Sequence, residues 1–178
     1  MTKQSMIKDR MKKLKVPASG EAIADLQPGD MVELSGYIFT GRDAVLPKLV
    51  TCIQEGKLAK SGLDLQGSVI FHTAVSPAGI GPTSSNKVEI EGSIPVLSEA
   101  GVKIHLGKGA LKPETVRALA ENNAVYAVTP PVTALFGSRV DSVEVAAFPE
   151  EGMEALHLLK VHDFPAIIAA AHGRSIYD

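Results

Sequence analysis

Apolar and polar residues follow two different periods along the chain, and together they predict strands separated by short helices. Alternating or nearly continuous apolar runs predict strands at residues 31–40, 68–74, 102–106, 124–128, 140–148 and 166–171. Helical spacing predicts helices at residues 21–26, 46–53, 113–121, 132–136 and 153–159. Strands that alternate with short helices are typical of an α/β domain.

Proline, glycine and charged residues indicate where some of these elements begin, bend or end. Residues 1–16 are interpreted as a flexible or helical N-terminal arm, because Pro17 ends the charged segment that they contain. Gly36 predicts a kink within the strand at residues 31–40. Asp43 is expected to cap the helix that follows this strand.

Two stretches give weaker signals. Residues 77–87 are rich in glycine, proline and serine, and they predict a turn-rich loop. Residues 88–97 show only a weak periodic pattern, which assigns no element to them. No internal repeat or interior linker interrupts the pattern, so residues 1–178 are expected to form one domain.

Composition narrows the class of protein. The chain has 178 residues, of which 45% are hydrophobic and 21% are charged, values close to those of soluble globular domains. A net charge of −2 argues against a nucleic-acid binder, and no apolar stretch has the length of a membrane span, so a cytoplasmic protein is expected. The single cysteine, Cys52, excludes an internal disulfide and a self-contained cysteine-ligated metal site.

Three polar clusters each follow a predicted strand. They are Arg42-Asp43, the segment from Thr83 to Lys87, and Lys108 between two glycines. Because ligands of open α/β sheets gather beyond the carboxyl ends of the strands, these clusters are expected to converge on one pocket. Arginine matches a carboxylate with its planar fork, lysine adds a compact charge, and exposed backbone N–H groups suit an anion. The sequence therefore predicts a site for a small anion such as a dicarboxylate.

Each cluster also has a simpler interpretation when it is taken alone. Arg42 and Asp43 are consistent with a local ion pair, and the serines after Thr83 are consistent with an ordinary turn. Lys108 does not belong to a Walker loop, because the upstream glycine spacing is wrong and no serine or threonine follows it. The prediction of an anion site depends on the three clusters together.

The histidines and the cysteine point less clearly to chemistry. His72 and His105 lie within strand patterns and are interpreted as buried core residues. His172 follows the last predicted strand and is expected to face the same end of the sheet as the polar clusters. Cys52 is interpreted as a small buried apolar residue. The sequence shows no pattern typical of a covalent hydrolase.

Three segments carry a resemblance to a known family. Residues 34–44 read Leu-Ser-Gly-Tyr-Ile-Phe-Thr-Gly-Arg-Asp-Ala, residues 81–85 read Gly-Pro-Thr-Ser-Ser, and residues 104–109 read Ile-His-Leu-Gly-Lys-Gly. In their order and approximate spacing they resemble the β subunit, or C-terminal domain, of class I iron–sulfur fumarate hydratases and L(+)-tartrate dehydratases. The resemblance implies a swivelling β/β/α domain of the aconitase-like mobile type, an α/β fold with a mixed sheet and short helices.

The same resemblance implies roles for individual residues. Arg42 would clamp a substrate carboxylate, Thr83 would be the base at the carbon that loses its proton, and Ser84 would donate a hydrogen bond beside it. Lys108 would bind a carboxylate or assist Thr83, and Lys87 would bind the second carboxylate. The further candidate site residues are Asp43, Ser85 and His172.

A partner and a cofactor are implied as well. The domain would close over a [4Fe–4S] cluster held by an α subunit, in agreement with a chain whose single cysteine cannot ligate such a cluster. The implied enzyme is an α2β2-type hetero-oligomer, in which contacts between β subunits are possible. It hydrates fumarate reversibly to (S)-malate, and the β subunit is active only with its α subunit. Neither a nucleic acid nor a membrane is an expected partner.

Departures from the family pattern leave the substrate open. Val45-Leu46 stands where the family usually has Ala-His, and Lys87-Val88 stands where it usually has Arg-Met. Lysine lacks the bidentate geometry of arginine, so Lys87 is expected to bind a second carboxylate less selectively. Fumarate is the first choice of substrate, and L(+)-tartrate or another hydroxy-dicarboxylate is the second. A non-catalytic anion-binding or structural subunit is the alternative of another class.

Overall fold

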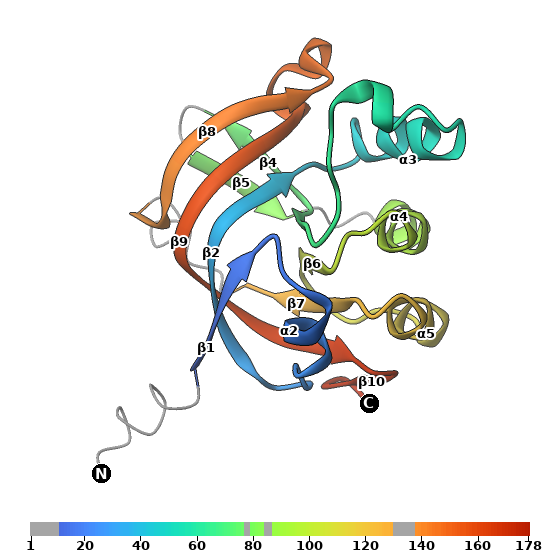
Figure 1. The fold of residues 1–178 in the computed structure, drawn as a ribbon, viewed down its shortest axis with the longest axis vertical. Coiled ribbons are helices and arrows are strands. Elements are labelled where there is room, and N and C mark those ends of the chain that lie inside the picture. The colour runs from blue at the N-terminus through green and yellow to red at the C-terminus, as the bar shows by residue number, and fades with distance from the viewer. Residues whose placement is uncertain (1–10, 77–78, 84–86, 130–137) are drawn as a thin grey trace.

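A small barrel of strands forms the centre of the molecule in the computed structural model, which describes residues 11–76, 79–83, 87–129 and 138–178, with the backbone alone at residues 76 and 79–83. Four strands pair in parallel, in the order β2 (Met31–Thr40), β3 (Val69–Phe71), β6 (Ile104–Gly107) and β7 (Val125–Val128). The long strand β9 (Leu156–Ala171) pairs antiparallel with both β7 and β2. This double pairing closes the sheet on itself (Figure 1).

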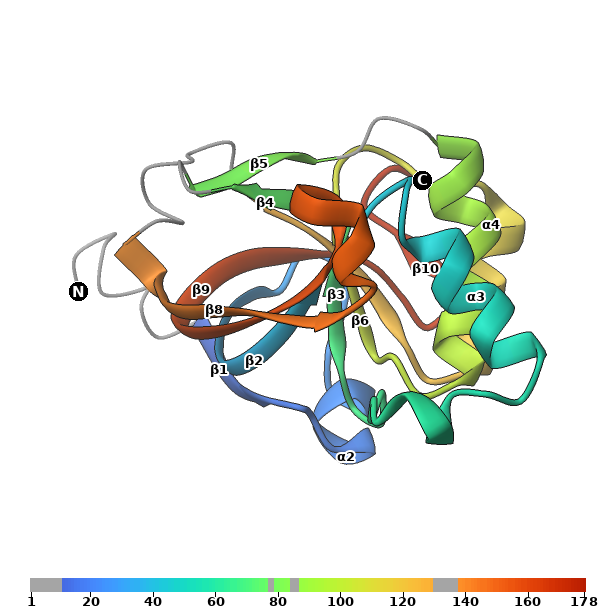
Figure 2. The ribbon, with the colours of Figure 1, turned by 90° about the horizontal axis from the view of Figure 1, so that it is seen from above.

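Helices cover one side of the barrel. α3 (Leu46–Gln54), α4 (Lys87–Glu99) and α5 (Pro113–Glu121) lie in a row beside the sheet in Figure 1, and Figure 2 shows α3 and α4 on the same side of the sheet. The short helix α2 (Gly20–Ala24) contributes Ile23 to the core of the barrel. A mixed sheet with a few short helices confirms the predicted α/β class.

Apolar side chains that alternate along the strands fill the barrel. Phe71 of β3 and Phe164 of β9 meet edge to face, with ring centroids 5.9 Å apart and ring planes at 72°. Other members of this core are Val69, Ile104, Leu106, Val125, Ala127 and Ile168. Ile70 and Tyr126 belong instead to the clusters under the helices, because successive residues of a strand point to opposite faces.

The first described residues form a strand, so the prediction of a flexible or helical arm is wrong for residues 11–16. β1 (Met11–Val16) pairs in parallel with β2 along its whole length. An ion pair fixes its start, with Lys12 Nζ 2.8 Å from Asp30 Oδ2. The predicted kink at Gly36 is confirmed: its φ is +129°, and a Cβ there would collide with the backbone oxygen of Val16.

A hairpin follows β3, where the sequence predicts a longer strand and then a loop. The strand ends at Phe71, and His72 separates it from β4 (Thr73–Ser76), which pairs antiparallel with β5 (Gly79–Thr83). The predicted loop is therefore wrong for residues 79–83. It is likewise wrong for residue 87, where α4 begins.

Helix α4 occupies the segment whose periodic pattern is weak. Two serines, Ser93 and Ser98, lie on its buried face among the apolar residues, and they blur the hydrophobic period. The Ser93 hydroxyl donates a hydrogen bond to the backbone oxygen of Ile90 at 3.0 Å, so this buried polar group has a hydrogen-bond partner.

The C-terminal part contains the largest difference from prediction. A helix is predicted at residues 153–159, whereas the structure has a 3₁₀ turn, η2 (Pro149–Glu154), followed by one 16-residue strand, β9. The first half of β9 pairs with β2 on one edge and with β8 (Val140–Ala147) on the other. Backbone pairing on both edges overrides the local helical spacing. The strand predicted at residues 140–148 is confirmed by β8, and the one at 166–171 is the end of β9.

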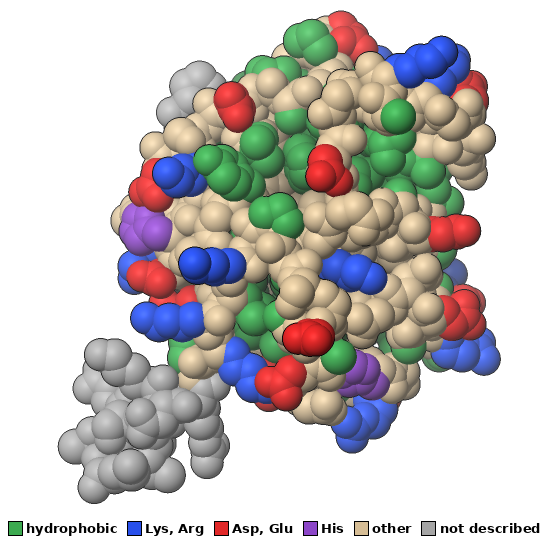
Figure 3. All heavy atoms as spheres, in the orientation of Figure 1, with side chains coloured by type: hydrophobic (Ala, Val, Ile, Leu, Met, Phe, Trp, Pro, Cys, Tyr) green, Lys and Arg blue, Asp and Glu red, His purple; other side chains and the backbone are tan. Residues whose placement is uncertain are grey.

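The remaining elements are the 3₁₀ turn η1 (Ala59–Ser61) and the short strand β10 (Arg174–Ser175). The helix predicted at residues 132–136 lies outside the described residues. Within the described part of the chain, none of the helices combines the length and apolar character needed to span a membrane. On the face seen in Figure 3, basic and acidic side chains are interspersed rather than gathered by sign.

Candidate functional site

The parallel strands bring two of the predicted polar clusters to one end of the barrel, here called the rim. The backbone N–H of Gly41 donates to the oxygen of Phe71 at 3.0 Å, and that of His72 donates to the oxygen of Leu106 at 3.0 Å. These bonds align the carboxyl ends of β2, β3 and β6. Arg42 and Asp43 directly follow β2, and Lys108 directly follows β6, so the structure places them on the same rim.

Two lysines meet on this rim. Lys87, the first residue of α4, donates from Nζ to the backbone oxygen of Lys108 at 2.5 Å. Gly109 leaves space for this side chain, since a Cβ there would lie 3.2 Å from Lys87 Nζ. Burial lowers the pKa of Lys87, and the positive charge of Lys108 lowers it further against the opposing effect of Glu91. The contact brings the Lys87 ammonium to the backbone of the loop that carries Lys108, and two lysines on one rim favour an anion there.

Arg42 is held between the end of β2 and the turn η2. Its Nε lies 3.1 Å from Oε1 of Glu154, and the two side chains are 30% and 37% exposed. The loop is closely packed at Gly41, where a Cβ would lie 2.8 Å from Val45 Cγ1 and 3.4 Å from Leu156 Cδ1. The guanidinium is thus fixed on the rim while it stays within reach of solvent.

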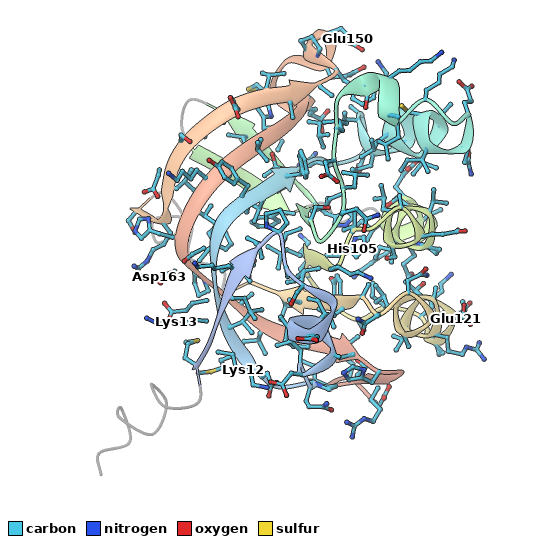
Figure 4. The ribbon with its side chains drawn as sticks, in the orientation of Figure 1. Lys12, Lys13, His105, Glu121, Glu150 and Asp163 are labelled. Carbon is cyan, nitrogen blue, oxygen red and sulfur yellow. The ribbon has the colours of Figure 1, made fainter. Side chains whose placement is uncertain are left out.

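A chain of three buried polar side chains, His72, His105 and Ser98 of α4, lies below the rim, and Figure 4 labels its middle member, His105. His72 Nε2 is 3.4 Å from His105 Nδ1, and His105 Nε2 is 2.9 Å from Ser98 Oγ. Burial lowers the pKa of His72 to about 4 and the pKa of His105 well below its usual range, so both rings are neutral near pH 7. The charge of Lys87 also lowers the pKa of His72, and that of Asp43 raises it.

The interpretation of His72 and His105 as buried core residues is confirmed, because neither is exposed. Their mutual contact and their position under the rim are not visible in the sequence. The signal that could have found them is their place near the ends of two neighbouring parallel strands, with His72 directly after β3 and His105 within β6.

Three helix N-termini add partial positive charge to this end of the molecule. α3 begins shortly after β2 ends, α4 begins at Lys87, and α5 begins shortly after Lys108. The N-terminus of a helix carries about half a positive charge from its aligned peptide dipoles. Together with Arg42, Lys87 and Lys108, these helices favour an anionic ligand at the rim.

Comparison with known proteins decides the family. The family described as Fumarase C-terminus matches residues 1–178, the whole chain. The chain belongs to this family. The resemblance seen in the three sequence motifs is thereby confirmed.

Relatives of this Fumarase C-terminus domain carry two kinds of name. A putative class I fumarate hydratase from Geobacillus stearothermophilus is 29% identical over 93% of this chain, which spans only 33% of that protein. A putative L(+)-tartrate dehydratase subunit beta from Methanocaldococcus jannaschii is 32% identical over 88% of this chain and 86% of its own length. The L(+)-tartrate dehydratase subunit beta of Escherichia coli is 28% identical over 93% and 87%. The named relatives are hydro-lyases or their β subunits, and the substrate, fumarate or tartrate, is unresolved.

Within the Fumarase C-terminus domain, the predicted base Thr83 lies at the end of β5. Its backbone is opposite Thr73, the first residue of β4 and the neighbour of His72. The hairpin therefore returns the chain to the rim at Thr83. Ser84 and Ser85, the two other candidates in this motif, lie outside the described residues.

Two placements differ from the sequence predictions. Asp43 does not cap α3, because Val45 occupies the cap position and makes no side-chain cap hydrogen bond. His172 follows β9, whose end lies beside the amino end of the antiparallel neighbour β7. His172 is thus at the opposite end of the barrel from Lys108, and the expectation that it shares the rim is wrong.

The described residues do not fit the ligand set of an iron–sulfur cluster. The only cysteine of the sequence, Cys52, is a partly exposed residue on α3 rather than the buried one predicted. No group of three or more His, Cys, Asp and Glu side chains in the described ranges is arranged to hold a metal ion. A cluster acting at this rim would need ligands from outside the described residues.

Proposed function

We propose that the chain is the β subunit of a hydro-lyase that hydrates fumarate reversibly to (S)-malate together with an α subunit. The observation that carries the proposal is the rim itself, where Arg42, Lys87 and Lys108 gather on the N-terminal side of three helices. Its charge suits a small dicarboxylate. The names of the relatives, which include β subunits, support an α-subunit partner.

Carboxylate binding is divided between two sides of the rim. Arg42 binds one carboxylate with the planar guanidinium that Glu154 holds in place. Lys87 and Lys108 bind the second carboxylate, where their two positive charges have a common partner. This arrangement orients the carbon–carbon double bond of fumarate across the rim.

Proton movement is assigned to Thr83. In the direction of dehydration, its oxygen takes the proton from the carbon next to a bound carboxylate, and the hydroxyl group leaves the adjacent carbon. A threonine hydroxyl is a weak base in water, and neighbouring cations such as Lys108 favour its deprotonated form. The resemblance assigns the [4Fe–4S] cluster to the α subunit, where it would supply Lewis-acid chemistry toward the substrate hydroxyl.

L(+)-tartrate dehydration is the second candidate. Relatives of similar length to this chain carry the name L(+)-tartrate dehydratase subunit beta. The lysine at position 87 contacts a second carboxylate as a point charge, which tolerates diacids of different shape better than a bidentate arginine does.

The test uses the complex of this chain with its α subunit, assembled without oxygen. Turnover of fumarate and of L(+)-tartrate is measured for the wild type, Arg42→Ala and Thr83→Ala. We expect kcat/KM on the preferred substrate to decrease by about 100-fold or more in both variants, because carboxylate orientation and proton transfer are each lost.

The matched control is Lys57→Ala. Lys57 lies beyond the far end of α3 and pairs with Glu55 at 2.7 Å, so its loss removes a cation without touching the rim. Unchanged turnover in Arg42→Ala and Thr83→Ala, with intact assembly, would show a non-catalytic subunit and overturn the proposal. Activity on L(+)-tartrate alone would select the second candidate.

A further inference from the structure

Glu154 is an acidic side chain that the structure places beside Arg42 on the rim. It is the last residue of η2, and its Oε1 lies 3.1 Å from Arg42 Nε. The pair joins two segments that are far apart in sequence. Neither the motif around Arg42 nor the pattern of the chain points to this contact.

Strand register explains why these two residues meet. β2 and β9 are antiparallel, and Thr40 at the end of β2 lies opposite His157 near the start of β9. Arg42 comes two residues after Thr40, and Glu154 comes three residues before His157. The two side chains therefore leave neighbouring strand ends on the same rim.

Close packing holds the backbone on both sides of the pair. Gly41 is so near Leu156 and Val45 that a Cβ could not be added without displacing the side chain of Val45. Leu156 and Val45 are themselves fully buried. The ion pair consequently joins two backbone segments that are held by packing, one next to Gly41 and one next to Leu156. It therefore restricts the orientation of the guanidinium more than an ion pair between mobile loops would.

We infer that Glu154 is a positioning residue, which acts through Arg42 to hold the guanidinium in the orientation that binds a substrate carboxylate. This inference rests on the proposed function. The guanidinium of an arginine is rigid and planar, so a carboxylate oxygen 3.1 Å from Nε restricts the orientation of the whole plane through their ionic attraction. Fixing this orientation before the substrate arrives lowers the entropic cost of binding.

A second ion pair on the same turn provides a matched comparison. Lys48 of α3 pairs with Glu151 of η2, Nζ–Oε1 2.5 Å, and with Glu150 at 3.3 Å. It links η2 to α3 just as Arg42–Glu154 links η2 to β2, but it includes no rim residue. A general effect of tethering η2 would appear in both pairs, whereas a positioning effect on the site would appear only at Glu154.

The experiment compares Glu154→Gln and Glu151→Gln in the complex with the α subunit. For Glu154→Gln we expect KM to rise about tenfold while kcat changes by less than about threefold, since substrate orientation is lost without loss of the base. The dissociation constant of succinate, a saturated dicarboxylate, should rise by a similar factor. Glu151→Gln should leave KM, kcat and succinate binding unchanged.

A double-mutant cycle separates positioning from general destabilisation. Arg42→Lys shortens and reshapes the cation, so Glu154→Gln should add no further increase in KM to the Arg42→Lys variant. Glu154→Asp keeps the charge but withdraws it by one methylene group, and an intermediate KM is expected. The Glu154→Asp variant also tests the inference if the Glu154→Gln variant fails to assemble with the α subunit.

Several results would overturn the inference. Unchanged KM and succinate binding in Glu154→Gln, or independent effects of Glu154 and Arg42, would show that the ion pair is only structural. A lower KM would show that Glu154 competes with the substrate for Arg42. If Arg42→Lys impairs turnover while Glu154→Gln does not, the proposed function stands and only the positioning role fails. A wild-type complex that neither binds succinate nor turns over a diacid would defeat both.

Discussion

The two faces of the barrel strands differ in what they bury. The inner face packs apolar side chains such as Phe71 and Phe164, whereas the face toward α4 carries the contact between His72 and His105. Successive residues of the same strands thus serve different purposes. The inner face supplies stability through apolar burial, and the helix-covered face carries a polar chain that ends beneath the rim.

Such a polar chain is a costly way to fill a core. Within the described residues, His72 Nδ1 is buried without a hydrogen-bond partner, and an unpaired buried group costs about 1–3 kcal/mol. An apolar side chain of similar size would avoid this cost. His72 directly follows β3 beneath the rim, and this position associates the cost with the candidate site rather than with the stability of the fold.

The largest effect is expected on the inner face. Phe164→Ala should reduce the free energy of unfolding by about 3–5 kcal/mol, because it removes a fully buried ring and its edge-to-face partner. Urea unfolding of the purified chain measures this change. Ile167→Ala on the same strand is the control, since Ile167 is 36% exposed and should cost much less. Equal losses in the two variants would contradict the assignment of the inner face as the main source of stability.

Much of the fold could be predicted from the sequence. β2 and β8 have the alternation that predicts strands, and α5 begins at Pro113 as its pattern indicates. In these segments the local pattern and the tertiary contacts favour the same structure. The three polar clusters could likewise be assigned to strand ends, because parallel strands place their loops at one rim.

The failures occur where tertiary contacts decide the structure. The first half of β9 has helical spacing, yet pairing with β2 and β8 on its two edges makes it a strand. Buried Ser93 and Ser98 conceal the period of α4. The Arg42–Glu154 ion pair depends on the register between β2 and β9, which no local pattern contains.

The helix-covered face should make stability depend on pH. The pKa of His72 is about 4 in the folded protein and near 6.5 when unfolded, so between these values the unfolded chain binds more protons. The free energy of unfolding should therefore decrease as pH falls from 6.5 toward 4, by up to about 3 kcal/mol from His72 alone. His105, whose pKa is also lowered, acts in the same direction.

Urea unfolding at several pH values between about 7 and 4.5 measures this dependence. The double variant His72→Leu/His105→Leu should show a much weaker dependence, because both buried titrating groups are removed. His162→Gln is the control, since it changes an exposed histidine that pairs with Asp141 at 2.8 Å. A wild type and a double variant with the same pH dependence would show that the buried pair does not control it.

A smaller effect is expected when the middle member of the polar chain is removed. His105→Leu leaves both His72 Nε2 and Ser98 Oγ without their neighbour, so the free energy of unfolding should decrease by about 1–3 kcal/mol at pH 7. The double variant His72→Leu/His105→Leu should lose less free energy of unfolding than the sum of the losses in the two single variants. In the double variant the ring of His72, which His105→Leu alone leaves unpaired, is absent. Additive losses would mean that the two rings contribute independently. In that case the polar chain under the rim would be two separate buried histidines. The inner and the helix-covered faces would then differ only in the size of the side chains that they bury.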